Sequence, residues 1–278
     1  MAVAVEFATS GVQTPLWVPF VVGVLASLVT APAGLSGAFL LLPFQFSVLG
    51  FTSPAVSATN LVFNCLATAG GTARYARDGA FRRHLVGPLV VGTLPAVVAG
   101  AYLRVTVFAG VEAFKLALGL VLGALGLALL VRATSRRTIP VEPDARIGHR
   151  RLIALGVVSG VMGGVVGVGG GGVIAPVLAL RTPLPVRLVA AATIAVSFCT
   201  TLVGLASYQV LAWTSAPGAA GMAIAPDWAL GAVFGAGGLL GSYLGARQTS
   251  WLNERAIRSL LGALLTVLAV VYLVPGAL

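Results

Sequence analysis

Six apolar segments, each about as long as a membrane-crossing helix, dominate this sequence. A helix needs roughly 20 apolar residues to cross about 30 Å of hydrocarbon. The segments of suitable length are 54–75, 84–104, 110–132, 188–213, 226–247 and 255–274. Hydrophobic residues make up 58% of the chain and charged residues only 9%, whereas soluble domains have about 25% charged residues. We therefore expect an all-α polytopic membrane protein.

Two further apolar stretches, 16–50 and 152–180, are longer and are interrupted by glycine. The first interruption is Ala33-Gly34-Leu35-Ser36-Gly37, directly after Pro32, and the second extends from Gly163 to Gly172. Glycine is unfavourable in the interior of a helix because it loses more backbone freedom than other residues. Each stretch is therefore predicted to be a broken helix, either a bent crossing or a re-entrant hairpin.

The distribution of basic residues distinguishes these two topologies. If both stretches cross the membrane, the 17 basic residues divide into ten and seven; if both are hairpins, they divide into fifteen and two. In the hairpin topology one side keeps only Arg104 and Lys115. The other side has Arg74, Arg77, Arg82, Arg83, Arg132, Arg136, Arg137, Arg146, Arg150, Arg151, Arg181, Arg187, Arg247, Arg255 and Arg258. Cytoplasmic loops are enriched in Arg and Lys. The hairpin topology is thus favoured, with a multi-pass chain in the cell membrane and both termini outside.

The two interrupted stretches are copies of one motif. Gly34-Leu-Ser-Gly37 followed by Pro43 matches Gly167-Val-Gly-Gly170 followed by Pro176. We predict an N-terminal repeat over 1–132, a cytoplasmic linker over 133–151 and a C-terminal repeat over 152–278. Each repeat has a hairpin and three crossing helices, so an odd number of crossings inverts the second repeat relative to the first. Inverted repeats with broken helices are typical of transporters, whose substrates bind near the midplane.

No Asp, Glu, Lys, Arg or His falls in the middle of a predicted span. Intramembrane carboxylates and histidines usually mark proton or cation pathways, and hydrolytic chemistry needs ionisable or metal-binding groups. His84 and His149 lie in arginine-rich segments that we place in the cytoplasm. We therefore expect no catalytic residue, no metal and no cofactor, which disfavours an intramembrane enzyme.

Broken helices in a membrane present free backbone N–H groups and the positive end of a helix dipole, which suits an anion. The helices after each hairpin add small polar side chains on one face. The predicted substrate-binding residues are Gly34, Ser36, Gly37, Ser57, Thr59, Asn60, Asn64, Gly169, Gly170, Gly171, Gly172, Thr193 and Ser197. Small residues also serve close helix packing, and that alternative stays open for each single Ser, Thr or Gly, as interhelical bonding does for Asn60 and Asn64. The five glycines in the six positions 167–172 exceed what packing needs. The repeat can be aligned in two ways, which pair Thr193 with either Asn60 or Thr59.

At these residues the chain resembles the sulfite exporter TauE/SafE family. The resemblance rests on Ala31-Pro-Ala-Gly-Leu-Ser-Gly37 with Pro43, on Gly167-Val-Gly-Gly-Gly-Gly172 with Pro176, and on the segments Ser57-Ala-Thr-Asn60 and Ala191-Ala-Thr-Ile194. It implies a transporter of sulfite or organosulfonates. Where the family tends to have glycine, this chain has Ser36 and Ala38, so the first half of the site is expected to be narrower or to supply a hydroxyl.

The membrane potential favours export. With a negative interior, each exported negative charge gains about 2.3 kcal/mol per 100 mV, so export needs no coupling ion. Import of thiosulfate, with sulfur contacts from Cys65 and Cys199, and an anion channel are the alternatives. The expected partners are a small anionic substrate and the lipid bilayer, without nucleic acid, and the sequence leaves a homo-oligomer open.

Overall fold

The computed structural model describes residues 4–31, 35–134, 147–214, 221–248 and 254–274, and these residues are mostly helical. The helices of the first half are α1 (Trp17–Thr30), α2 (Ala38–Pro43), the π-helix η2 (Phe44–Val48), α3 (Ala55–Arg77), α4 (Arg83–Thr106) and α5 (Val111–Thr134). Those of the second half are α6 (His149–Val166), α7 (Gly171–Arg181), α8 (Val186–Trp213), α9 (Trp228–Gln248) and α10 (Glu254–Leu273). A short antiparallel pair, β1 (Val5–Glu6) and β2 (Gln13–Thr14), precedes α1.

The long helices follow the apolar segments closely. α3, α4, α5, α8, α9 and α10 begin and end within two residues of the ranges expected from hydropathy. Among the described residues, α4, α5, α6 and most of α8 are long and apolar enough to cross a membrane. Shorter apolar helices include α1 and the continuous segment formed by α2 and η2. The fold is that of an all-α membrane protein, apart from the small β-hairpin.

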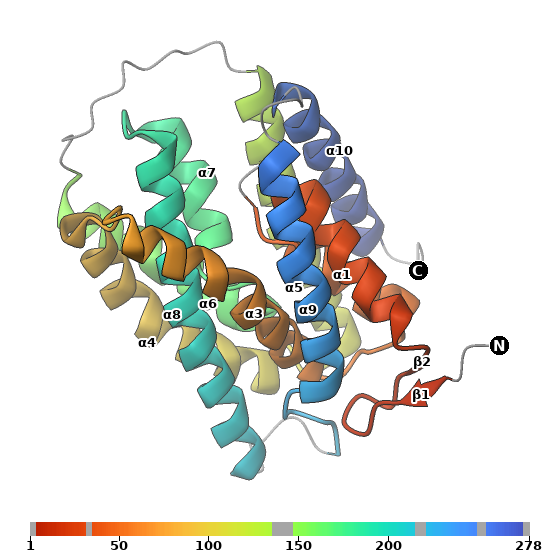
Figure 1. The fold of residues 1–278 in the computed structure, drawn as a ribbon. Coiled ribbons are helices and arrows are strands. Elements are labelled where there is room, and N and C mark those ends of the chain that lie inside the picture. Colours follow the sequence, from red (N-terminus) through yellow and green to blue (C-terminus); the bar gives the residue numbers. More distant parts are fainter. Residues whose placement is uncertain (1–3, 32–34, 135–146, 215–220, 249–253, 275–278) are drawn as a thin grey trace.

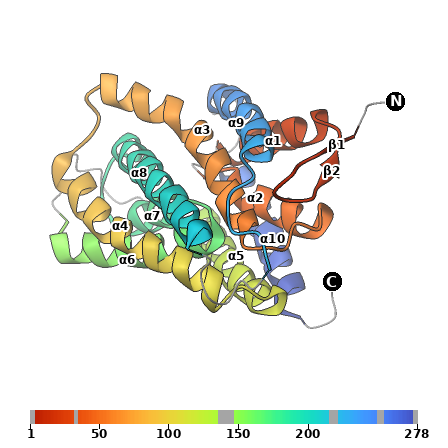
Figure 2. The ribbon, with the colours of Figure 1, turned by 90° about the horizontal axis from the view of Figure 1, so that it is seen from below.

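The helices pack as pairs from distant parts of the chain (Figures 1 and 2). α4 lies along α6, α1 along α9, and α5 along α10, while α3 contacts both α8 and α9. Glycine allows the close approach: a Cβ at Gly92 of α4 would lie 2.3 Å from the carbonyl oxygen of Ile153, and one at Gly237 of α9 would lie 2.1 Å from that of Phe20. Small residues at helix contacts are how membrane helices pack without a hydrophobic driving force between them.

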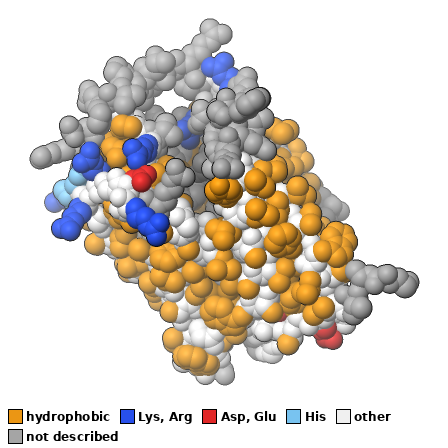
Figure 3. Space-filling view, viewed as in Figure 1, with side chains coloured by type: hydrophobic (Ala, Val, Ile, Leu, Met, Phe, Trp, Pro, Cys, Tyr) orange, Lys and Arg blue, Asp and Glu red, His pale blue; other side chains and the backbone are white. Residues whose placement is uncertain are grey.

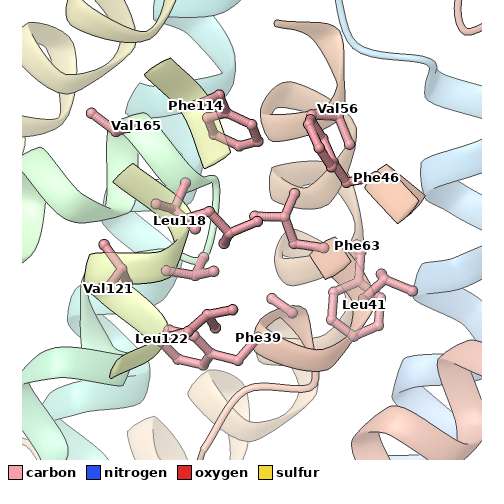
Figure 4. Packing of buried hydrophobic residues seen from close by; sticks show 14 of the residues in the cluster. Phe39, Leu41, Phe46, Val56, Phe63, Phe114, Leu118, Val121, Leu122 and Val165 are labelled. Carbon is pink, nitrogen blue, oxygen red and sulfur yellow. The ribbon is translucent and has the colours of Figure 1, made fainter. Parts of the chain in front are cut away.

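The interior around the two interrupted stretches is filled by aromatic and branched side chains (Figure 4). Phe39 and Phe46, from α2 and η2, belong to one buried cluster with Phe63 of α3, Phe114 of α5 and Val165 of α6. Phe46 packs against Phe114 with ring centres 5.4 Å apart. The short helices of the first stretch are therefore enclosed by the long helices on several sides.

The outer surface suits a lipid environment (Figure 3). Hydrophobic side chains cover the middle of the face shown, and Lys and Arg side chains gather toward one end. Exposed leucines and valines line the outside of α5 and α10, among them Leu116, Leu120, Leu127, Leu260, Leu264 and Val267. Large exposed apolar patches mark membrane or protein contact surfaces. Together with the long apolar helices, this surface fits a protein embedded in a membrane.

Candidate functional site

The second glycine run interrupts the helix and reverses the chain. α6 ends at Val166, and the next residue, Gly167, has φ +74°. Gly169 has φ +69° before α7 begins at Gly171. The Ser159 hydroxyl donates a hydrogen bond to the carbonyl oxygen of Gly170. Ser159 lies two turns before the end of α6, about 10 Å back along the helix. α7 therefore starts by returning alongside α6.

The first interruption has a similar reversal. The backbone N–H of Leu35 donates to the carbonyl oxygen of Thr30 over 3.1 Å. Beyond it, a Cβ at Gly37 would lie 2.7 Å from the Ser27 hydroxyl oxygen of α1. α2 thus begins beside the last turns of α1. Gly34, a predicted site residue, lies outside the described residues.

Asn64 of α3 connects the two interruptions. Its Oδ1 accepts a hydrogen bond from the Ser36 hydroxyl over 2.5 Å, and its Nδ2 donates to the carbonyl oxygen of Gly167 over 3.3 Å. One turn earlier, Asn60 Nδ2 donates to the carbonyl oxygen of Ala38 over 3.2 Å. Both asparagine side chains are fully buried. These contacts bring Ser36, Asn60 and Asn64 together with both glycine segments.

α8 supplies hydroxyls to the start of α7. The Ser197 hydroxyl oxygen accepts a hydrogen bond from the Gly171 N–H over 2.8 Å. A Cβ at Gly169 would lie 3.3 Å from both Ser197 Oγ and Thr201 Oγ1. A Cβ at Gly172 would overlap the Phe39 ring of the first stretch, at 2.2 Å. Gly169 and Gly171 therefore lie against α8, and Gly172 lies against α2.

Several buried polar groups of α1, η2, α3 and α8 lack a partner among the described residues. The atoms are Ser27 Oγ, Asn60 Oδ1, Thr201 Oγ1 and both side-chain atoms of Gln45. Within the same described part of the chain, no hydrogen bond from the N–H groups of Gly169 and Gly170, which precede α7, is found. Gly172 lies in the first turn of α7, where helix N–H groups have no partner within the helix. Buried polar groups are nearly always hydrogen-bonded. The N–H groups at the start of α7, an 11-residue helix, and the Thr201 hydroxyl form a donor set suited to an anion.

Some predicted residues have other contacts. The Thr59 hydroxyl accepts a hydrogen bond from the Asp227 N–H over 2.9 Å, at the start of α9. The Thr193 hydroxyl donates to the Ala190 carbonyl oxygen of its own helix over 3.1 Å. Ser57 donates to the Val165 carbonyl oxygen over 2.9 Å, near the end of α6. The thiols of Cys65 and Cys199 are free and partly exposed.

The family follows from comparison with known proteins. The sulfite exporter TauE/SafE family matches residues 19–272. The chain belongs to this family. The probable membrane transporter protein y4hK of Sinorhizobium fredii (strain NBRC 101917 / NGR234) is 28% identical over 245 residues, covering 86% of this chain and 91% of that protein. No solved structure matches the chain. Family membership and the apolar helices identify a membrane transporter.

Sequence reasoning missed two polar residues of this TauE/SafE protein. Arg104, which we expected at an outer helix end, is fully buried in the last turn of α4. Its signal is a difference between the repeats: Gly100-Ala-Tyr-Leu103 is followed by Arg104, whereas Gly241-Ser-Tyr-Leu244 is followed by Gly245. The other missed residue is Gln45, the single amide side chain in the apolar stretch 38–49.

The donor set of this family member contains no ready metal site. Among the residues that the structure describes, no three His, Cys, Asp or Glu side chains are grouped closely enough to bind a metal ion. The groups that converge on the glycine segments are backbone amides, hydroxyls and carboxamides. Such groups can bind a small oxyanion by hydrogen bonding without a chemical step.

Proposed function

We propose that this protein exports a small sulfur-containing anion, sulfite or an organosulfonate, across the cell membrane. The observation that carries the proposal is the meeting of the two glycine interruptions at Asn64, beside the backbone at the start of α7 and the buried Thr201 hydroxyl, which has no partner among the described residues. The family description supports sulfite as the substrate class. The geometry supports a small anion, because hydrogen bonds act only at short range and the donors of this site are enclosed by packed side chains.

The anion is held by donors from both halves. At the second interruption these are the N–H groups of Gly169, Gly170 and Gly172 with the hydroxyls of Ser197 and Thr201. The first interruption supplies the backbone N–H groups of Ser36 and Gly37, since the Ser36 hydroxyl already donates to Asn64 Oδ1. A helix N-terminus carries roughly half a positive charge, so α7 stabilises a negative guest. Broken helices bind substrates this way in other carriers.

The fold supports two repeats of opposite orientation, 1–132 and 152–278 around a linker at 133–151. α4 packs along α6, and the corresponding pair α9 and α1 packs in the same way. Likewise α3 contacts α9, and the corresponding α8 contacts α4. α4 runs parallel to α6, because Gly92 meets Ile153 and Gly100 meets Val161. α9 runs parallel to α1 in the same way, because Gly237 meets Phe20 and Gly241 meets Val24. A two-fold axis in the membrane plane would generate these matching contacts.

This arrangement gives a multi-pass topology with both termini outside, and site-directed labelling tests it. In a cysteine-free background, Ser53→Cys should react with an impermeant thiol reagent from outside, and Arg181→Cys only after the inner side is opened. Labelling of both from the same side would rule out the inverted repeats. It would leave membership of the transporter family intact.

Export follows the membrane potential, because each negative charge moved outward gains about 2.3 kcal/mol per 100 mV. The test is the current in proteoliposomes that contain purified protein and a sulfite gradient alone. We expect a saturable sulfite current without proton or sodium gradients. Strict dependence on either gradient would contradict uncoupled export, and a current that does not saturate would indicate a channel.

A further inference from the structure

Arg104 is a charged group inside the protein whose contacts are all uncharged. Its side chain is 0% exposed. It donates hydrogen bonds to the carbonyl oxygens of Phe108, Thr52 and Ser53 and to the hydroxyl of Ser57, and it lies over the ring of Phe114. The guanidinium carbon is 3.8 Å from the centre of that ring. The contacts come from α3, α5 and the connections beside them.

No carboxylate of the described residues pairs with Arg104. Among the described residues, Glu112 forms an ion pair with Lys115, and Asp78 forms one with Arg187. The Asp227 carboxylate accepts hydrogen bonds from Ser10 and from the Leu230 N–H. Burying a charge without a counter-ion is costly, and intramembrane charges are usually retained for function.

The position of Arg104 connects it to the second glycine segment. Its Nε donates to Ser57 Oγ over 3.3 Å, and Ser57 Oγ donates to the Val165 carbonyl oxygen over 2.9 Å. The backbone of Ser57 also touches Gly167, where a Cβ would lie 2.1 Å from the Ser57 carbonyl oxygen. Arg104 is thus two hydrogen bonds from the end of α6. Its field acts on the same interruption that supplies the N–H donors.

We propose that Arg104 sets the charge specificity of the transport site, favouring divalent over monovalent sulfur anions. This inference rests on the proposed anion transport. It adds Arg104 as a specificity-determining residue that is not among the residues of the proposed anion site. In the protein interior, an uncompensated positive charge interacts over longer distances than in water. The interaction is proportional to the charge of the guest. A divalent anion therefore gains twice the stabilisation of a monovalent one.

The experiment is a calorimetric binding comparison in lipid nanodiscs with two sulfonates, monovalent methanesulfonate and divalent sulfoacetate. The variants are Arg104→Gln and Arg104→Lys, with Arg150→Gln, at an exposed arginine of α6, as the control for loss of one positive charge. For Arg104→Gln we expect Kd to rise about fivefold for methanesulfonate and about 25-fold for sulfoacetate, the square of the first factor, because the Coulomb energy doubles. Arg104→Lys should keep the wild-type affinity ratio, and so should Arg150→Gln.

A purely structural role for Arg104 predicts a different pattern. Loss of the carbonyl contacts would weaken the binding of both anions by the same factor. Arg104→Lys would then lose affinity as Arg104→Gln does. Either result overturns the inference. If Arg104→Gln does not fold, a change of the affinity ratio in Arg104→Lys still overturns it. Wild-type protein that binds neither anion would instead contradict the proposed function for sulfonates.

Discussion

Asn64 donates a hydrogen bond from Nδ2 to the carbonyl oxygen of Gly167 over 3.3 Å, across a separation of 103 residues in the chain. Its Oδ1 accepts the Ser36 hydroxyl on the other side. One carboxamide thus holds together the two segments at which helices are interrupted. Displacement of either segment would break one of these bonds, so Asn64 couples the position of one interruption to that of the other.

Replacing Asn64 should therefore impair both stability and transport. Asn64→Leu removes two hydrogen bonds and leaves the Ser36 hydroxyl and the Gly167 carbonyl unpaired in the interior. We expect the free energy of unfolding to fall by about 2–6 kcal/mol, since each of the two unpaired buried groups costs about 1–3 kcal/mol. The measurements are thermal unfolding in detergent and sulfite flux in proteoliposomes. Cys65→Ala, at the next residue of α3, is the matched control, and wild-type flux in Asn64→Leu would contradict the coupling.

The left-handed backbone at Gly167 permits a sharper stability test. Gly167 and Gly50 have similar φ angles, +74° and +66°, but a Cβ would meet the Ser57 carbonyl oxygen at 2.1 Å at Gly167 and nothing within 4 Å at Gly50. Gly50→Ala should cost about 1–2 kcal/mol, the ordinary cost of a left-handed residue. Gly167→Ala adds a collision with the Ser57 backbone, and we expect it to lower the free energy of unfolding by about 3 kcal/mol or more.

Comparison of the two melting temperatures in one detergent checks this prediction. Equal shifts for Gly50→Ala and Gly167→Ala would mean that the contact between α6 and Ser57 is not as close as the structure has it. A selective loss in Gly167→Ala would establish that the end of α6 is held against α3.

Thr201 and Thr200 provide a pair of variants with opposite expected effects. Both side chains are fully buried, but the Thr200 hydroxyl donates to the Val196 carbonyl oxygen over 2.7 Å, whereas Thr201 Oγ1 has no partner among the described residues. Thr201→Val should keep or raise the melting temperature, because it removes an unpaired polar atom. It should weaken sulfite binding about 10- to 100-fold, because a hydrogen bond to a charged group contributes about 1.5–3 kcal/mol.

Thr200→Val should have the reverse pattern, with a lower melting temperature and unchanged sulfite affinity. Calorimetric titration and thermal unfolding of the two purified variants provide both readouts. If Thr201→Val bound sulfite as well as the wild type, its hydroxyl would have no part in the anion site.

The cysteines should be dispensable for sulfite transport. Cys65 and Cys199 are free, partly exposed thiols that form none of the hydrogen bonds around the glycine segments. The double variant Cys65→Ala and Cys199→Ala should keep wild-type sulfite flux in proteoliposomes. A marked loss in this variant would instead favour a sulfur compound, such as thiosulfate, recognised through thiol contacts.

The limits of the helices and the interruptions were predictable because they depend on local composition. Apolar length predicts a crossing helix, as for α4 and α5, and consecutive glycines destabilise a helix wherever they occur, as at 167–172. Which polar residues gather at the interruptions was only partly predictable. Asn64 and Ser197 do lie there, and the backbone of Thr193 lies against Gly171, although its hydroxyl bonds to its own helix. The Thr59 hydroxyl instead contacts Asp227 at the start of α9.

The amino-acid sequence by itself determined that this chain enters a membrane as apolar helices with two glycine breaks, because hydropathy and helix propensity act over one or two turns. Tertiary structure decided which side chains face those breaks. The small polar residues on one face of α3 and α8 indicate which face turns inward, but only packing decides which of them contact the breaks. Asn64 binds both breaks, whereas the Thr59 hydroxyl contacts Asp227. The burial of Arg104 has the same origin: its neutral partners come from α3, α5 and connecting segments, and only the folded chain brings them to one charge.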